Sequence, residues 1–196
     1  MKTDVQRVHI SGASGCGVTT LGKALAQKLS AVHLDTDDFY WLPTDPPYRE
    51  KRPESLRVEL LKEAFSFAVE TGWVLCGALG SWGAPLAPFF KIVVFLHAPT
   101  EVRLERLRAR EALRFGAEAV APGGWRHAES TAFLEWAAGY DTGSCEGRSR
   151  PRQEAWLAQL PCPVLRLDST QPAEVLVQQV VAVLQATHDA GSSAGR

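Results

Sequence analysis

The sequence has almost no net charge and no long hydrophobic run, and these two shortages exclude several classes of protein. Its 21 Lys and Arg residues nearly balance its 22 Asp and Glu residues, which gives a formal net charge of −1. Such a chain has no general attraction to nucleic acid or to an anionic membrane surface. No apolar run approaches the roughly 18 residues of a membrane-spanning helix, and residues 1–4 lack the apolar core of a signal peptide. We therefore expect a cytoplasmic protein that has neither nucleic acid nor membrane as a partner.

Cysteine is scarce as well. The four cysteines stand far apart in the chain and show no metal-ligand spacing: Cys16, Cys76, Cys145 and Cys162. Reduced thiols are the simplest explanation, and they agree with a cytoplasmic location.

The stretch of residues 12–20, Gly-Ala-Ser-Gly-Cys-Gly-Val-Thr-Thr, is the most informative motif. It follows an apolar run and precedes a helical pattern, which is the order of a phosphate-binding P-loop. Gly12 and Gly17 match the two glycines of that pattern, and Thr19 stands where a hydroxyl would hold Mg²⁺. Val18 occupies the position of the usual lysine. The predicted nucleotide-binding residues are Gly12, Ser14, Gly15, Cys16, Gly17, Val18, Thr19 and Thr20.

The remaining chain alternates between strand-like and helix-like segments, which indicates an α/β fold with a parallel sheet. Ligands of such sheets lie beyond the carboxyl ends of the strands, so residues 12–20, 35–41 and 77–83 should meet in one cleft. We expect one domain over residues 1–186 and a disordered polar tail over 187–196. The expected strands are 5–10, 31–35, 73–77, 91–96 and 163–168, and the expected helices are 19–29, 53–68, 99–115, 125–139, 152–159 and 172–186.

Three aspartates, Asp35, Asp37 and Asp38, follow the second expected strand. Carboxylates this close repel one another, so a cation or a proton must relieve them. Mg²⁺ suits oxygen ligands, and we expect Thr19 and Asp35 to hold it. Asp37 or Asp35 is the candidate catalytic acceptor of a proton from a substrate hydroxyl, since strand-like alternation would point both the same way. The alternative is that Asp37 or Asp38 caps a short helical turn.

The aromatic run after these acids is expected to form a flat wall for a planar acceptor, although packing in the core is an equal alternative. Arg49 and Arg52 lie farther along the chain, in a segment of about residues 38–70 that would cover the site. They could hold an anionic substrate group or remain ordinary surface residues. The predicted substrate-binding residues are Asp38, Phe39, Tyr40, Trp41, Arg49 and Arg52.

The helix expected after residue 99 carries Arg103, Arg106 and Arg110 on one face, with no acid three or four positions from any of them. Such a stripe favours phosphate binding and would supply the charge that Val18 lacks. Arg106 and Arg110 are therefore candidate catalytic residues within a lid region of about residues 103–150. A second basic group, Arg148, Arg150 and Arg152, is expected in a solvated loop unless closure of the lid brings one inward.

The P-loop, the acidic cluster and the arginine-bearing helix, in this order, resemble the adenylate-kinase-like kinases of nucleosides, nucleotides and small metabolites, which include shikimate and gluconate kinases. Residues 12–20 and 35–41 are most similar to a bacterial subgroup without the P-loop lysine. The resemblance implies a three-layer P-loop fold with five parallel strands in the order 2-3-1-4-5, helices on both faces and a lid. It also implies ATP, with GTP as the alternative, and Mg²⁺.

The expected function is therefore ATP- and Mg²⁺-dependent phosphoryl transfer to a small molecule. The aromatic run favours a nucleoside or nucleotide acceptor. Because Val18 replaces the lysine, a non-catalytic nucleotide-binding sensor and a slow nucleotide hydrolase remain alternatives. We expect a monomer or a homodimer.

Overall fold

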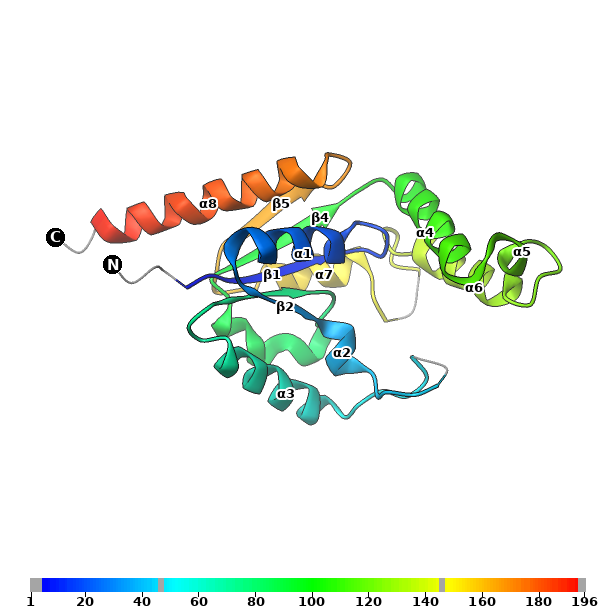
Figure 1. Ribbon diagram of the computed structural model, residues 1–196, viewed down its shortest axis with the longest axis horizontal. Coiled ribbons are helices and arrows are strands. Elements are labelled where there is room, and N and C mark those ends of the chain that lie inside the picture. The colour runs from blue at the N-terminus through cyan, green and yellow to red at the C-terminus, as the bar shows by residue number, and fades with distance from the viewer. Residues whose placement is uncertain (1–4, 46–47, 145–146, 194–196) are drawn as a thin grey trace.

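One parallel sheet forms the centre of the molecule (Figure 1). The computed structural model describes residues 5–45, 48–144 and 147–193. The strands are β1 (Arg7–Gly12), β2 (Val32–Asp35), β3 (Trp73–Cys76), β4 (Ile92–His97) and β5 (Val164–Asp168), and their order is β2-β3-β1-β4-β5. All four neighbouring pairs are parallel. The predicted fold class and strand order are confirmed.

Helices cover both faces of this sheet. One face packs against α1 (Val18–Leu29) and α8 (Ala173–Ser193), and the other against α3 (Glu54–Phe67), the 3-10 segment η1 (Gly80–Phe89) and α7 (Arg150–Leu157). Within β3, Val74 and Cys76 pack on the first side, whereas Trp73 and Leu75 pack on the second. Because both faces are covered, β3 and β4 read as nearly continuous apolar runs.

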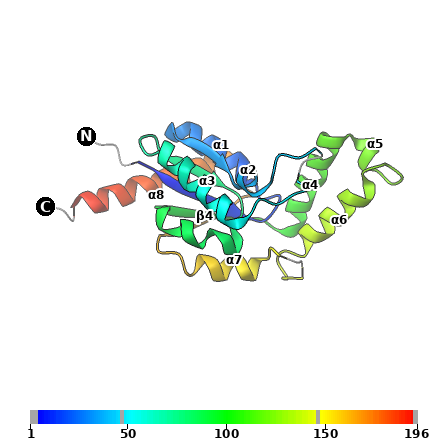
Figure 2. The same ribbon diagram turned by 90° about the horizontal axis from the view of Figure 1, so that it is seen from below.

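Three further helices project from the end of the sheet opposite the chain termini, as Figures 1 and 2 both show. They are α4 (Thr100–Phe115), α5 (Ala117–Val120) and α6 (His127–Ala138), and we call them the lid helices. The short helix α2 (Thr36–Tyr40) follows β2 at the same end. Within the described ranges, no helix is long and apolar enough to cross a membrane.

Most expected elements are present within a few residues of their predicted bounds. The sequence patterns missed η1 and α5, which show no helical apolar periodicity, and they gave α2 only as the alternative of a short helical turn. The expectation of disorder from residue 187 is wrong as far as Ser193, since α8 continues to that residue. No proline interrupts residues 187–193, and Ala190 is a strong helix former. Residues 194–196 lie outside the described residues.

The central strand carries a buried histidine on the face that α7 covers. His9 is fully buried, stacks on Phe90 at 5.0 Å and meets Trp156 edge-on at 5.8 Å. Its Nδ1 lies 3.1 Å from the carbonyl oxygen of Leu75, and its Nε2 has no hydrogen-bond partner among the described residues. Burial lowers the pKa of His9 to about 4, because a charged ring would lose its hydration.

This shift predicts a loss of stability in weak acid. The unfolded state binds a proton near pH 6.5 and the folded state only near pH 4, so the free energy of unfolding falls as the pH decreases between these values. The expected loss is about 3 kcal/mol. Urea unfolding from pH 7 to pH 4 measures it, and His9→Phe, which cannot titrate, should flatten the profile. An equal loss in His9→Phe would refute this role of the histidine.

Candidate functional site

The loop of residues 12–20 joins β1 to α1 in a compact turn. Gly15 and Gly17 have φ values of 85° and 78°, which are accessible to glycine at little cost. The backbone N–H of Cys16 donates to the carbonyl oxygen of Ala13 at 3.1 Å and closes the turn. A Cβ atom on Gly15 would lie 2.6 Å from the carbonyl oxygen of Arg103, so a larger residue would push the loop away from α4.

The start of α1 is arranged to receive an anion. Gly17 is the N-cap and provides no side-chain cap for the first turn of this 12-residue helix. Nothing lies within 4 Å of the place where its Cβ would be. The first N–H groups of a helix have no intrahelical partner and carry partial positive charge. This loop therefore has the backbone of a phosphate-binding site.

Three arginines contact the loop through its backbone carbonyl groups. Arg148 Nη2 donates to the oxygen of Gly12, Arg103 Nη1 to that of Ser14 at 3.4 Å, and Arg106 Nη1 to that of Gly15 at 3.4 Å. The arginines therefore stabilise the loop and place positive charge around it.

The face predicted for Arg103, Arg106 and Arg110 divides into three environments. Arg103 is buried, and its guanidinium also contacts Ala137 O at 3.2 Å, Thr100 Oγ1 at 3.0 Å and Asp141 Oδ2 at 2.7 Å. Arg106 bridges the loop to the backbone oxygen of Ser169 after β5, at 2.9 Å. Arg110 lies over the ring of Phe133 on α6, at 5.6 Å. Of the two predicted catalytic arginines, Arg106 contacts the loop, and Arg110 packs against the lid; both roles stay predictions.

Asp35 connects the loop to the acidic segment. Its Oδ2 accepts a hydrogen bond from Thr19 Oγ1 at 3.2 Å, and its Oδ1 accepts one from the backbone N–H of Asp37 at 3.1 Å. Asp35 is therefore the N-cap of α2. The expectation that alternation aligns Asp35 with Asp37 is wrong, because the chain turns helical at Thr36. Of the alternatives, the short helical turn exists, but its cap is Asp35 and neither Asp37 nor Asp38.

Asp37 lies in the first turn of α2, beside Asp35 and within the field of Arg148. Its side chain stays accessible to solvent. Crowding by protein atoms nevertheless raises the pKa of Asp37, and the Asp35 carboxylate raises it further. Arg148 acts in the opposite direction. A carboxylate with a raised pKa is a better proton acceptor than an ordinary aspartate. Asp38 follows on the same short helix and is exposed.

The aromatic run is divided between the core and the surface. Phe39 and Tyr40 are half-buried and pack against the apolar cluster beneath α3 and η1. Tyr40 also lies under the guanidinium of buried Arg57, at 4.0 Å. Trp41 packs between Tyr40 and Tyr48, with ring centroids 4.8 and 5.9 Å away. Binding of an acceptor to this run stays a prediction.

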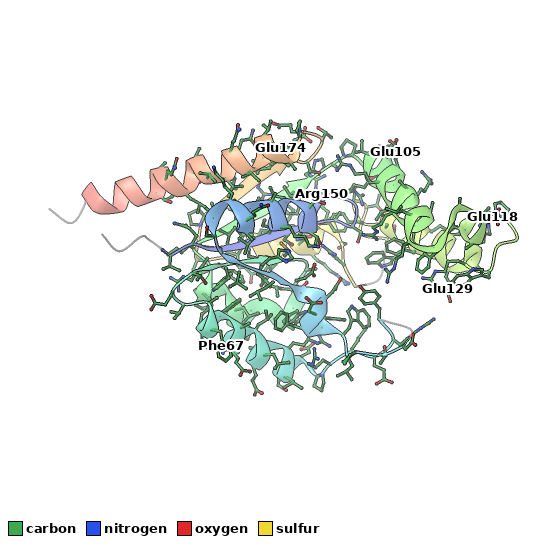
Figure 3. All side chains as sticks on the ribbon, in the orientation of Figure 1. Phe67, Glu105, Glu118, Glu129, Arg150 and Glu174 are labelled. Carbon is green, nitrogen blue, oxygen red and sulfur yellow. The ribbon has the colours of Figure 1, made fainter. Side chains whose placement is uncertain are left out.

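The covering segment reaches the lid helices. Arg49 Nη2 lies 3.9 Å from Glu129 Oε1 on α6, and Arg114 of α4 lies over the ring of Tyr48 at 5.4 Å. Figure 3 shows Glu129 on the projecting lid side. Arg52 Nη1 instead donates to the carbonyl oxygens of Asp38, Phe39 and Trp41. Arg52 thus stabilises the end of α2, and a contact of its own with substrate stays a prediction.

Arg148, Arg150 and Arg152 were all expected in a solvated loop, but Arg150 and Arg152 lie in α7. Arg148 is half-buried and contacts the loop, as described above. Arg150 is labelled in Figure 3 near the central strands, and its Nη1 lies 3.2 Å from His97 Nε2 at the end of β4. Only the density of arginines at 148, 150 and 152 could have drawn attention to them, because the partners of Arg148 and Arg150 are distant in the sequence.

A protein-family model described as an AAA domain matches residues 8–115, which is more than half of the chain. The chain belongs to this AAA-domain family. The matched part runs from β1 to the end of α4 and so contains the loop, the acidic segment and the covering segment.

The chain is also similar to curated proteins and to solved structures. The chain is 43% identical over 176 residues to the uncharacterized protein YqaC of Bacillus subtilis strain 168, covering 90% of this chain and 96% of YqaC. It is 29% identical to a shikimate kinase of Enterococcus faecalis over 53% of this chain and 66% of the relative. A gluconokinase structure from Sinorhizobium meliloti 1021 matches with a TM-score of 0.55 and 18% identity over 97% of this chain and 98% of that one. The fold is that of the P-loop kinases.

The oxygen atoms of Thr19 and Asp35 are suitable ligands for a hard divalent cation. Thr19 and Asp35 bring a hydroxyl and a carboxylate oxygen within 3.2 Å of each other, and Mg²⁺ prefers oxygen ligands. Among the described residues, no group of three or more His, Cys, Asp or Glu side chains could hold a metal ion alone. A cation at Thr19 and Asp35 would therefore take further ligands from water and phosphate.

The Arg103–Asp141 pair is expected to hold the loop against the lid helices. Partial burial works to raise the pKa of Asp141, but hydrogen bonds from Thr100 and Arg103 hold it below the usual value. Removing one partner of a buried ion pair costs about 3–5 kcal/mol. Arg103→Met should lower the free energy of unfolding by that amount in urea. Arg108→Met, at an exposed position of α4, should change it by less than about 0.5 kcal/mol. Equal effects would show that Arg103 has no clamping role.

Proposed function

We propose that this protein is an ATP- and Mg²⁺-dependent kinase that transfers the γ-phosphoryl group to a hydroxyl of a small metabolite. The observation that carries the proposal is the hydrogen bond between Thr19 and Asp35. It joins a P-loop hydroxyl to a strand-end carboxylate at the uncapped start of α1. Phosphate binding, cation binding and proton acceptance then require only residues that are already adjacent.

Each group has a defined part in this reaction. The N–H groups of the loop and of the first turn of α1 bind phosphate oxygens. The oxygen of the acceptor hydroxyl forms a bond to the γ-phosphorus, and Asp37 accepts the proton of that hydroxyl. At the same time, the bond between the γ-phosphorus and the bridging β-phosphate oxygen breaks. Arg106, at the edge of the loop, stabilises the charge that develops on the transferring group. Mg²⁺, held by Thr19 and Asp35, would neutralise phosphate charge when bound.

The acceptor is proposed to be a hydroxyl-bearing small metabolite. The names shikimate kinase and gluconokinase, carried by a sequence relative and a structural neighbour, support this class. A nucleoside, which the aromatic run favoured, has less support because Phe39 and Tyr40 pack against the core. It remains the second choice, through Trp41. ATP is preferred to GTP only by the resemblance to adenylate-kinase-like proteins.

One observation favours a second function, a nucleotide-binding sensor without turnover. Val18 stands where the P-loop lysine is expected, and its side chain packs partly buried against the apolar cluster beneath α1. A missing cation would slow transfer more than binding. The two functions differ in a direct way, since a sensor binds ATP and forms no phosphorylated product.

A cytoplasmic location belongs to the same proposal. Cys16, Cys76 and Cys162 are free thiols, which persist in reducing compartments. Cys145 lies outside the described residues. A monomer or homodimer that works on a small molecule, without nucleic acid or membrane, stays our expectation.

The direct test is incubation with ATP, Mg²⁺ and a pooled metabolite library, with mass spectrometry to detect the compound that gains a phosphate. With that acceptor, Asp37→Asn should lower kcat by about 100-fold or more, the usual contribution of a general base, and leave ATP affinity unchanged. Because the pKa of Asp37 is raised, activity should fall on acidification at a pH above the ordinary aspartate pKa, and this limb should vanish in Asp37→Asn.

Asp45→Asn is the matched control, because it removes an exposed carboxylate from the covering segment. It should leave the rate and the pH profile as they are. ATP binding by the wild type without any phosphorylated product would favour the sensor, and a normal rate in Asp37→Asn would remove the proposed base.

A further inference from the structure

The missing lysine leaves open which group supplies positive charge at the phosphates. We propose that Arg148, from the segment between α6 and α7, takes this role by placing its guanidinium at Gly12 of the phosphate-binding loop. The inference rests on the proposed function and deepens it. It assigns to the transferred phosphates a residue that is 130 positions from Val18 in the chain.

The side chain at position 18 is directed toward Gly12. The Cγ2 atom of Val18 lies 3.3 Å from the place where a Cβ on Gly12 would be. A longer side chain at position 18 that follows the same direction would therefore pass Gly12. The Val18 side chain is too short to extend past this glycine; it packs against apolar side chains and carries no charge.

Arg148 approaches the same glycine from the α7 side. Its Nη2 donates a hydrogen bond to the carbonyl oxygen of Gly12. A guanidinium carries five N–H donors in a planar fork that matches the oxygens of a phosphate. The guanidinium of Arg148 therefore contacts Gly12, the same residue that the side chain of Val18 approaches.

The residues that follow Arg148 are held by hydrogen bonds. Ser149 is buried, its carbonyl accepts from the backbone N–H of Gln153 at 3.0 Å, and the N–H of Arg150 donates to Tyr140 O at 2.8 Å. The side chain of Gln153 donates to Ser11 Oγ on β1 and accepts from the hydroxyl of Tyr140 at 2.5 Å. These hydrogen bonds connect the start of α7 to β1, the strand that leads into the loop. Positioning Arg148 at the loop therefore loses little additional conformational entropy.

The charge of Arg148 also acts on the proposed base, Asp37, in the direction that lowers its pKa. Arg106 contacts the same loop at Gly15, whereas Arg103 is bound to Asp141 and Arg110 lies over Phe133.

The test compares binding of ATP, AMP and adenosine by calorimetry. Arg148→Met keeps the length of the side chain and removes the charge. ATP affinity should fall about 10- to 100-fold, the value of a charge-assisted hydrogen bond. AMP and adenosine, which lack the outer phosphates, should bind as they do to the wild type. Arg148→Gln keeps an N–H donor for Gly12 and should lose ATP affinity equally, which separates charge from folding. Arg108→Met is the control and should bind ATP normally.

A rescue experiment examines the link to position 18. Val18→Lys should restore ATP affinity in Arg148→Met and give no gain in the wild type, because the two cations would compete for one place. Equal gains in both backgrounds would make the positions independent and would overturn the proposal. Normal ATP affinity in Arg148→Gln would overturn it as well.

Failure of this inference differs from failure of the proposed function. If the wild type binds ATP but phosphorylates no metabolite, kinase activity is excluded, and loss of ATP affinity in the Arg148 variants still supports the inference. If the wild type is an active kinase and the Arg148 variants bind ATP normally, only the role of Arg148 is lost.

Discussion

The free N–H groups at the start of α1 are the feature on which the rest of the site depends. Gly17 begins the helix without a side-chain cap, and the positive end of the helix therefore points at the place where β1 ends. An uncapped helix start is a cost unless an anion satisfies it. The loop geometry, the arginines that contact the loop and the acidic segment are all arranged around this point, which is the reason for assigning it to phosphate.

Positive charge reaches the loop from distant parts of the chain. Arg103, Arg106 and Arg148 contact the carbonyls of Ser14, Gly15 and Gly12. Two of these arginines come from α4 and one from the segment before α7, so the loop is joined both to the lid helices and to the helix beneath β1.

Local spacing was enough to predict the loop and most of the sheet, because a glycine pattern and continuous apolar strands depend on near neighbours. Long-range contacts were not predictable in the same way. Arg103 has no acid nearby in its helix, but Asp141 folds back to meet it. Asp35 was expected in an extended run with Asp37, and instead it caps a helix that begins one residue later. The contact of Arg148 with Gly12 forms only when α7 packs against the sheet next to β1, so the sequence could not predict it.

We infer that backbone amides of the loop bind nucleotide phosphates although position 18 carries no charge. A crystal structure with Mg²⁺ and a non-hydrolysable ATP analogue would test this inference. We expect phosphate oxygens within hydrogen-bonding distance of the N–H groups of Gly17, Val18 and Thr19, with the metal near Thr19 and Asp35. A nucleotide bound elsewhere, or loop amides directed away from every phosphate, would contradict it.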